Sequence, residues 1–216
     1  MATLENGING RVSGTAGPVV GVKGKDGKNY ARSKPKQTVK AKSKPLQPQH
    51  KNLAIMSAML ALAKNFIAIG FVNKKKKGQQ MTLAMKYNLQ HAIVHLDNES
   101  VIDYSALKFS RGKRERVWSE ELFFKAGGVI QASWEVPEAL SMKHLGNDEA
   151  KFIIYNVNSN RLLHMNCRPL RSDLKFKKKL LAADAGDTIH VWMFFVSPDG
   201  KEVSDSDYLG SGVILP

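Results

Sequence analysis

The sequence predicts an α+β protein that is mainly β and has three parts. These are a basic, glycine-rich N-terminal arm (residues 1–48), a helical hairpin (49–98) and an antiparallel β-sandwich of the immunoglobulin or fibronectin type III kind (99–216). Three observations lead to this prediction. Residues 7–44 combine spaced glycines with lysines and prolines and have too few apolar side chains for a core. Residues 48–93 are apolar at helical spacing, and from residue 101 the apolar period changes to two.

Length, composition and charge narrow the possible functions. The chain has 216 residues, of which 43% are hydrophobic, so it can bury a sizeable core. Its formal net charge is +14, and residues 1–80 hold the whole excess, with 16 basic and two acidic side chains. The remaining 136 residues are formally neutral. A neutral globular part with a basic N-terminal region indicates a polyanionic partner: nucleic acid, an anionic membrane surface or an acidic protein.

The arm is expected to form strands and turns rather than a helix. Val19, Val20 and Val22 enter a predicted hairpin, residues 24–27 turn, and residues 30–32 leave it. The glycines from position 7 to 24 also fit one face of a packing helix. However, Pro18 interrupts them, and glycine costs about 1 kcal/mol per helical site relative to alanine. Such an arm needs its own downstream domain, another copy of the chain or a polyanion to become ordered.

Residues 33–49 predict an extended, solvated linker, because prolines alternate with lysines there. The lysine cluster at residues 74–77 is interpreted either as a solvated loop or as a contact for a polyanion. The basic residues expected to contact a polyanion or partner are Lys23, Lys25, Lys28, Arg32, Lys34, Lys36, Lys40, Lys42, Lys44, Lys74, Lys75, Lys76 and Lys77.

A first helix is predicted from about Pro48 to Ile69, stopped by Gly70, and a second over residues 81–93. The first is apolar on nearly every side, which favours burial in the protein or between subunits. The alternative is a membrane span, which is not favoured because residues 53–72 barely reach the ~20 residues required and Lys64 interrupts them. The residues expected to pack against another helix or subunit are Leu53, Met56, Leu60, Phe66 and Ile67.

Short strands are predicted through the rest of the chain, with turn residues between them. Trp134 and Trp192 alternate correctly to be core residues, and a helical crossover is expected over 137–147. The predicted strands cover residues 102–109, 122–125, 129–136, 152–157, 161–166, 174–180, 188–196, 202–208 and 213–215.

Neither catalysis nor a cofactor is indicated. His91 and His95 have zinc-ligand spacing on a predicted helix, but the spacing supplies no third ligand. Asp205 and Asp207 lie on one face of a predicted strand, so calcium is an alternative to a solvated acidic turn. The glycine-rich arm lacks a phosphate-loop pattern. We therefore expect no enzyme, no cofactor and no metal.

Cellular context is only weakly constrained by the sequence. Cys167 is the only cysteine, so the chain forms no intrachain disulfide, which fits a reducing compartment. The first nine residues lack the pattern of a signal peptide, although export by another route stays open.

Several stretches resemble a known family. They are GRVSG at 10–14, GPVVG at 17–21, KNYARSKP at 28–35, PLQPQ at 45–49 and GDTIHVWMFFVS at 186–197. Together they resemble a family of unknown function that is frequent in Bacteroidetes genomes and their phages, over almost the whole chain. The arm is also similar to the openings of some phage structural proteins. The resemblance implies a particle component and supplies no active site. The lysine-rich stretch at 36–44 departs from the family pattern.

The leading functional prediction is a non-enzymatic, self-assembling structural subunit of phage or phage-like origin, made in the cytoplasm and located in a virion or other particle. Its arm would make the subunit contacts, giving a homo-oligomer or particle. The alternative is a nucleic-acid-binding protein that uses its basic N-terminal region. Only Tyr30 supplies an aromatic ring beside the arm's lysines, so such binding would be independent of base sequence.

Overall fold

The computed structural model describes residues 3–5, 11–23, 28–34, 46–71, 78–96, 99–136, 145–163 and 167–216. The chain divides into two compact units, Met1–Ser43 and Lys44–Pro216. The fold is mainly β, with three α-helices and several antiparallel sheets in the described residues, as the sequence predicts at this level. The boundary between the units lies close to the predicted end of the arm.

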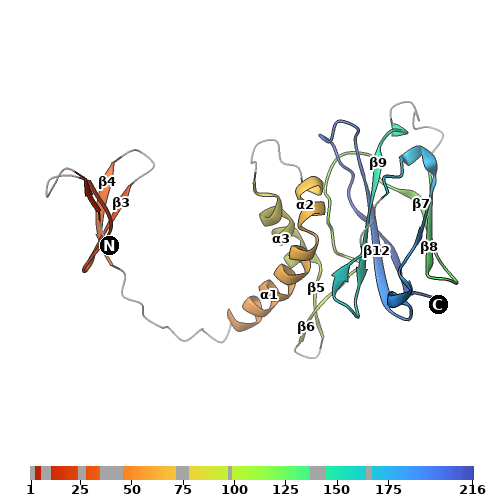
Figure 1. Ribbon diagram of the computed structural model, residues 1–216, viewed down its shortest axis with the longest axis horizontal. Helices are drawn as coiled ribbons and strands as arrows, with labels where there is room; N and C mark the ends of the chain where they lie inside the picture. The colour runs from red at the N-terminus through yellow and green to blue at the C-terminus, as the bar shows by residue number, and fades with distance from the viewer. Residues whose placement is uncertain are drawn as a thin grey trace. The chain divides into compact units, whose positions relative to one another are not determined.

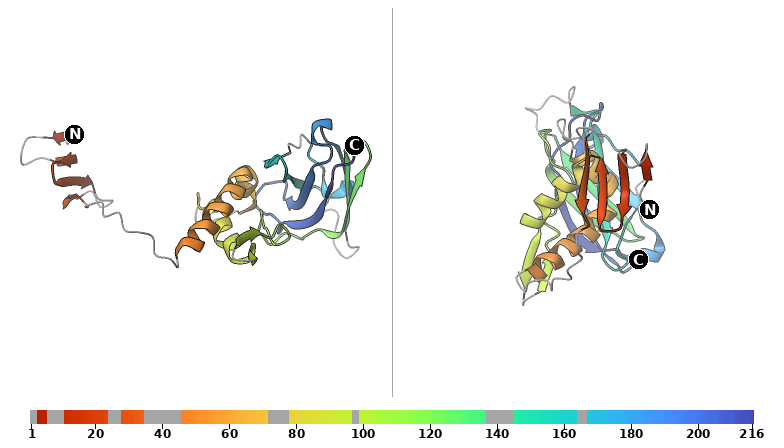
Figure 2. Two further views of the ribbon diagram at one scale, coloured as in Figure 1. Left: turned by 90° about the horizontal axis from the view of Figure 1, so that it is seen from below. Right: turned by 90° about the vertical axis from the view of Figure 1, so that its left-hand side faces the viewer.

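The N-terminal unit is a four-stranded antiparallel sheet in the order β1-β2-β3-β4 (Figure 2). The predicted hairpin is confirmed, because Val20 lies opposite Arg32 and Val22 opposite Tyr30; its turn at 24–27 lies outside the described residues. The alternative interpretation, a packing helix with the glycines on one face, is therefore wrong. Among the residues of this sheet whose burial is described, Gly21 alone is buried. Its strands are β1 (Thr3–Glu5), β2 (Arg11–Ala16), β3 (Val19–Lys23) and β4 (Asn29–Ser33).

The predicted first helix is two helices, α1 (Leu46–Leu62) and α2 (Lys64–Gly70), which meet at a bend of 85°. Ala63 causes the break with a φ of −93° and a ψ of 17°, outside the helical region. The bend allows residues of both helices, including Leu60 and Ile67, to enter one core. No single described helix is long and apolar enough to cross a membrane, although this bent pair passes a test of length and composition.

The second helix, α3, spans Gln80–His91 and ends two residues earlier than predicted. Ile93 instead begins a two-stranded hairpin of β5 (Ile93–Leu96) and β6 (Glu99–Ile102), which the sequence did not predict. Both α1 and α2 contact α3, so the two predicted helical segments do pack together.

The C-terminal unit is built on a central antiparallel sheet in the order β10-β9-β12-β13 (Figure 1). Its two central strands pair along their length, with Ile153 opposite Trp192 and Ile154 opposite Val191. All the apolar side chains of β12 are buried, because both faces of this sheet are covered. The strands are β9 (Glu149–Asn156), β10 (Arg161–Leu162), β12 (Thr188–Val196) and β13 (Asp207–Val213).

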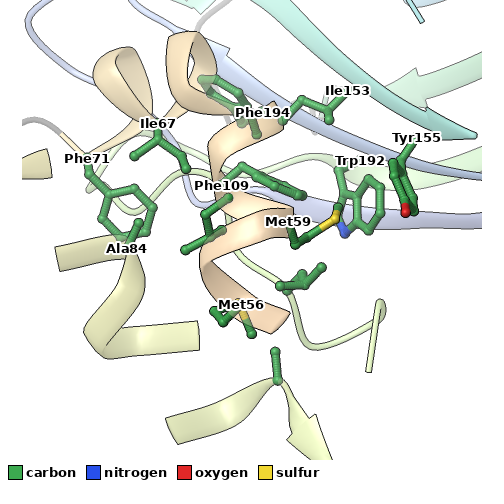
Figure 3. Close-up of a cluster of buried hydrophobic side chains, with 14 of the residues drawn as sticks. Met56, Met59, Ile67, Phe71, Ala84, Phe109, Ile153, Tyr155, Trp192 and Phe194 are labelled. Atoms are coloured by element: carbon green, nitrogen blue, oxygen red, sulfur yellow. The ribbon is translucent and has the colours of Figure 1, made fainter. Parts of the chain in front are cut away.

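One face of the central sheet packs on the helices. Figure 3 shows Met59 of α1 beside Trp192, with Phe109 between the helices and the strands; Met56 of α1 belongs to the same core. Trp192 is fully buried and donates a hydrogen bond from Nε1 to the Tyr104 carbonyl at 3.1 Å. Its predicted place in a core is confirmed.

The other face of the central sheet packs on a three-stranded sheet in the order β11-β8-β7. Trp134 of β8 is 2% exposed in this second core and donates to the Arg171 carbonyl at 2.9 Å, so its predicted burial is also confirmed. We refer to this sheet as the outer sheet; Figure 1 shows it on the side of the central sheet away from the helices. Its strands are β7 (Trp118–Lys125), β8 (Val129–Glu135) and β11 (Lys175–Lys179).

Three strand predictions need correction. Residues 103–109 form no strand, although Leu107 and Phe109 are buried as the alternation suggested. The backbone of Lys108 makes its hydrogen bonds with the Asn88 side chain instead of with a neighbouring strand. The Asn88 amide donates to the Lys108 carbonyl and accepts from the Lys108 N–H, both at 2.8 Å. In place of the last two predicted strands, over 202–208 and 213–215, the structure has one strand, β13. The predicted crossover lies mostly in 137–144, outside the described residues.

Candidate functional site

The structure describes only part of the predicted polyanion-contact set. Lys28, Arg32 and Lys34 lie on or beside edge strand β4 and are exposed. Lys23 ends β3. The other members of the set, Lys25, Lys36, Lys40, Lys42, Lys44, Lys74, Lys75, Lys76 and Lys77, lie outside the described residues. The structure therefore brings the exposed basic residues of β4 together around Tyr30, which is 51% exposed.

The predicted subunit-packing residues are mostly internal, which corrects that assignment. Met56, Leu60 and Ile67 are at most 1% exposed and belong to the core between the helices and the central sheet. Phe66 is half-buried against the same core, whereas Leu53 is 46% exposed. The sequence identified the apolar residues correctly but left open whether the same chain or another subunit covers them, because the strand residues of this core, from Ile153 to Val196, are more than 80 positions away.

A different face of α1 remains exposed. It consists of small or apolar uncharged residues between Lys51 and Lys64, and these are Leu53, Ala54, Ser57, Ala58, Ala61 and Leu62. Leu62 is 40% exposed, and Ile69 in α2 is 36% exposed. A helix face without charge is unusual on a solvated surface. We call it the α1 face.

The zinc and calcium alternatives considered from the sequence are not supported by the described residues. His91 ends α3 while His95 lies in β5, so the helical spacing that suggested zinc does not exist. Asp205 accepts from the Gly112 N–H at 3.0 Å, and Asp207 is bound by Arg116 and Lys108. These carboxylates tie the loop at 107–116 to β13. Within the described ranges, no group of three potential ligands could hold a metal ion.

A buried ionic cluster joins the loop before β7 to the segment before β11. Asp148 and Arg171 are fully buried, and the Arg171 Nε lies 3.2 Å from Asp148 Oδ2. Arg114 donates to both Asp148 oxygens, from NH2 at 2.7 Å and from Nε at 3.0 Å. Burial lowers the pKa of the Arg171 guanidinium, which also stacks 3.7 Å above the Phe195 ring. Each of these charged groups has an oppositely charged partner, so we interpret the cluster as structural.

Aromatic residues gather at one end of β12. Tyr104 stacks on His190 with ring centroids 4.1 Å apart, and His190 Nδ1 lies 2.7 Å from the Tyr208 hydroxyl. Burial lowers the pKa of His190, and burial beside Tyr104 raises the pKa of Tyr155 to about 12. Both shifts favour neutral side chains, as expected for packing residues.

The outer sheet exposes a face that the sequence did not single out. Trp118 and Phe123 of β7 are 49% and 45% exposed. Along edge strand β11, Lys175, Lys177 and Lys179 point away from the core, because Phe176 between them is 5% exposed. The alternation Lys-Phe-Lys-Lys-Lys in the sequence is typical of a strand with outward lysines. That Trp118 and Phe123 lie on the same face follows only from the pairing of β11, β8 and β7. We call this solvent-exposed face of the outer sheet the outer face.

Comparison with known families gives a match that covers most of the chain. The model of the family of unknown function DUF6266 matches residues 11–210. The chain belongs to this family. No curated protein matches the chain. The family match begins at Arg11, the first residue of β2, so DUF6266 includes three strands of the N-terminal sheet as well as the helices and both sheets of the C-terminal unit.

Proposed function

We propose that this DUF6266 protein is a non-enzymatic, self-assembling structural subunit whose N-terminal sheet binds another copy of the chain. The observation that supports it is the exposure of the four-stranded sheet where its burial is described: Val19, Val22 and Tyr30 are 40%, 38% and 51% exposed. A sheet in water requires a hydrophobic face packed on another element, because fixing each backbone residue costs about 1–2 kcal/mol. A partner surface offsets that cost.

Strand addition is the contact mode that the N-terminal sheet favours. β4 is an edge strand with all five residues exposed, so one side of its backbone is open for pairing. The face that carries Val20, Val22 and Tyr30 supplies apolar contacts to the same partner. The α1 face supplies a second contact surface between copies. In this proposal the particle is of phage-like origin, and the two stacked sheets of the C-terminal unit form an immunoglobulin- or fibronectin-like sandwich.

Sedimentation velocity at two salt concentrations tests the proposal. The full chain should sediment as an oligomer at both, because apolar and main-chain contacts are weakly screened. Deleting residues 1–43 should leave a cooperatively folded monomer or a smaller species, since Lys44–Pro216 has its own cores. Assembly that survives this deletion unchanged contradicts the role of the N-terminal sheet.

Point variants separate the two surfaces. Val22→Asp places a charge on the N-terminal sheet, and Val157→Asp is its control, because Val157 is similarly exposed at 37% in a turn of the C-terminal unit. Leu62→Glu changes the α1 face, and its control is Thr82→Glu on the exposed side of α3. We expect each test variant to shift the sedimentation coefficient toward the monomer, with both controls unchanged. If Val22→Asp behaves like Val157→Asp, the sheet makes no subunit contact.

The second candidate function is sequence-independent nucleic-acid binding by the N-terminal region. Its support is the exposed row of Lys28, Arg32 and Lys34 beside Tyr30. Replacing these three basic residues with Gln should reduce retention on a nucleic-acid column at low salt. Equal retention of the variant would contradict this candidate.

A further inference from the structure

We propose that the outer face of the β11-β8-β7 sheet binds single-stranded nucleic acid, with phosphates along β11 and bases stacked on Trp118 and Phe123. This site goes beyond the proposed assembly function and is separate from the basic N-terminal region.

The sheet register places the lysines and aromatic rings on one face. Lys177 lies opposite Gln131 of β8, and Gln131 lies opposite Phe123 of β7, so the three residues form one row across the sheet. Directly opposite residues in an antiparallel pair point to the same side. Trp118 lies opposite Glu135, which is on the outward side of β8, so Trp118 shares that face. The Lys125 Nζ donates to Gln131 Oε1 at 2.6 Å across the same surface.

The charge pattern favours a strand of phosphates over β11. Its three outward lysines alternate along the strand, so they repeat about every 6.8 Å at a rise of about 3.4 Å per residue. This repeat is comparable to the spacing of phosphates along an extended single strand. Of the acids of this face, Glu121 lies on β7 between Trp118 and Phe123, and Glu135 lies on β8 two residues beyond Ser133, the last residue of β8 that pairs with β11. A polyanion is therefore directed along β11, with its bases toward β7.

The aromatic side chains identify the polyanion. Lysines on an edge strand also prevent edge-to-edge pairing, and that role alone would explain β11. It gives no role to Trp118 and Phe123, which are about half exposed on the same face as these lysines. A basic row beside aromatic rings is the arrangement that binds single strands, where bases are free to stack. The uncharged side chains of Gln131 and Ser133 lie between the two rows.

Fluorescence anisotropy with fluorescein-labelled dT20 and the full chain tests the affinity. The test variant replaces Lys175, Lys177 and Lys179 with Gln. Its control replaces Lys64, Lys86 and Lys113, which are exposed elsewhere, and changes the net charge equally. We expect the test variant to bind at least tenfold more weakly at low salt and its salt slope to fall by up to ~2, at ~0.7 per phosphate. The control should bind within twofold of the unchanged protein.

Tryptophan fluorescence reports stacking directly. The chain has three tryptophans, of which Trp134 and Trp192 are buried, so quenching by added dT20 should come from Trp118. Trp118→Phe should abolish the quenching while retaining binding. Trp118→Ala should weaken binding roughly 5- to 150-fold, the range for loss of one stacked base.

Four results would overturn the site. They are the absence of dT20 binding, equal affinities for the β11 variant and its control, binding without Trp118 quenching, and equal or tighter binding of a duplex of the same length. Equal loss of affinity only on replacing Lys28, Arg32 and Lys34 would assign binding to the N-terminal region instead. Anisotropy and fluorescence quenching measure the binding of dT20, whereas sedimentation of the same variants measures assembly, so the two proposals are tested separately.

Discussion

The N-terminal sheet and the central sheet are both four-stranded and antiparallel, yet they differ completely in burial. In β12 every apolar side chain is buried between the helices and the outer sheet. In β4 all five residues are exposed. Backbone pairing is similar in the two sheets, so the difference lies in what covers their side chains. Hydrogen bonds alone give little net stability, because water replaces them in the unfolded chain. The central sheet is covered by elements of its own unit, and the exposure of the N-terminal sheet is the reason for our proposal that another copy of the chain covers it.

Hydrogen exchange gives the largest expected contrast. In dilute protein, amides of β9 and β12 should exchange at least about 10³-fold more slowly than those of β3 and β4, because the former open only with the whole core. Mass spectrometry of peptic peptides measures this. Raising the protein concentration should slow exchange in β3 and β4 if another copy covers them. Equal protection of both sheets in dilute protein would contradict the comparison.

The buried ionic cluster should respond strongly to the loss of one partner. Asp148→Ala leaves Arg171 buried without its counter-charge and should reduce the free energy of unfolding by about 3–5 kcal/mol. Urea denaturation followed by tryptophan fluorescence measures it. Glu202→Ala is the control, because Glu202 is 56% exposed at its contact with Arg114 and should cost under about 1 kcal/mol. Similar decreases in the free energy of unfolding in both variants would show that burial does not determine how much an ion pair of this cluster contributes to stability.

Two glycines, one in α2 and one in the turn between β2 and β3, allow the two units to be compared at the level of a single methyl group. A Cβ on Gly70 would lie 2.2 Å from the Phe109 carbonyl oxygen, so Gly70→Ala should destabilise the C-terminal unit by about 1–3 kcal/mol. Gly17 has a φ of +54° and open space around it. Gly17→Ala strains only the N-terminal turn and should leave the main thermal transition unchanged. An unchanged melting temperature in Gly70→Ala would refute the close packing of α2.

The smallest expected effect concerns pH. Burial lowers the pKa of His190 below its ordinary 6.5, so the unfolded chain binds this proton more readily than the native one. The contribution of His190 is therefore complete above pH 6.5 and is lost as the pH falls through its folded pKa. Between pH 6.5 and 5, the stability of His190→Gln should decline less steeply than that of the unchanged protein. Parallel curves from urea denaturation would contradict this role.

The sequence predicted the elements whose signal is local. The apolar run of β12 and the valines of β3 gave correct strands, and both buried tryptophans followed from alternation. It did not predict the break at Ala63, where neither proline nor glycine stands. Nor did it predict the loop at 103–109, because the Asn88 side chain supplies the pairing that a strand would have made.

The candidate surfaces were less predictable because they depend on register and distant contacts. The lysines of β11 were visible in the sequence, but their position beside Phe123 follows from the pairing of β11, β8 and β7. Met56 and Leu60 were correctly expected to be buried, yet nothing local showed that β12 of the same chain covers them. Ions such as Asp148 and Arg171 meet from separate segments, so spacing gave no signal.

The contact between α1 and β12 also affects the order of events during synthesis on the ribosome. Leu60 is made early, whereas Trp192 and Phe194, which share its core, come near the end of the chain. At about 5–20 residues per second, the roughly 130 residues between Leu60 and Trp192 take about 6–26 seconds to translate. Throughout that interval the apolar side of α1 has no sheet to cover it. A nascent chain of this design depends on chaperones or on its flanking lysines to stay soluble until its last strands emerge.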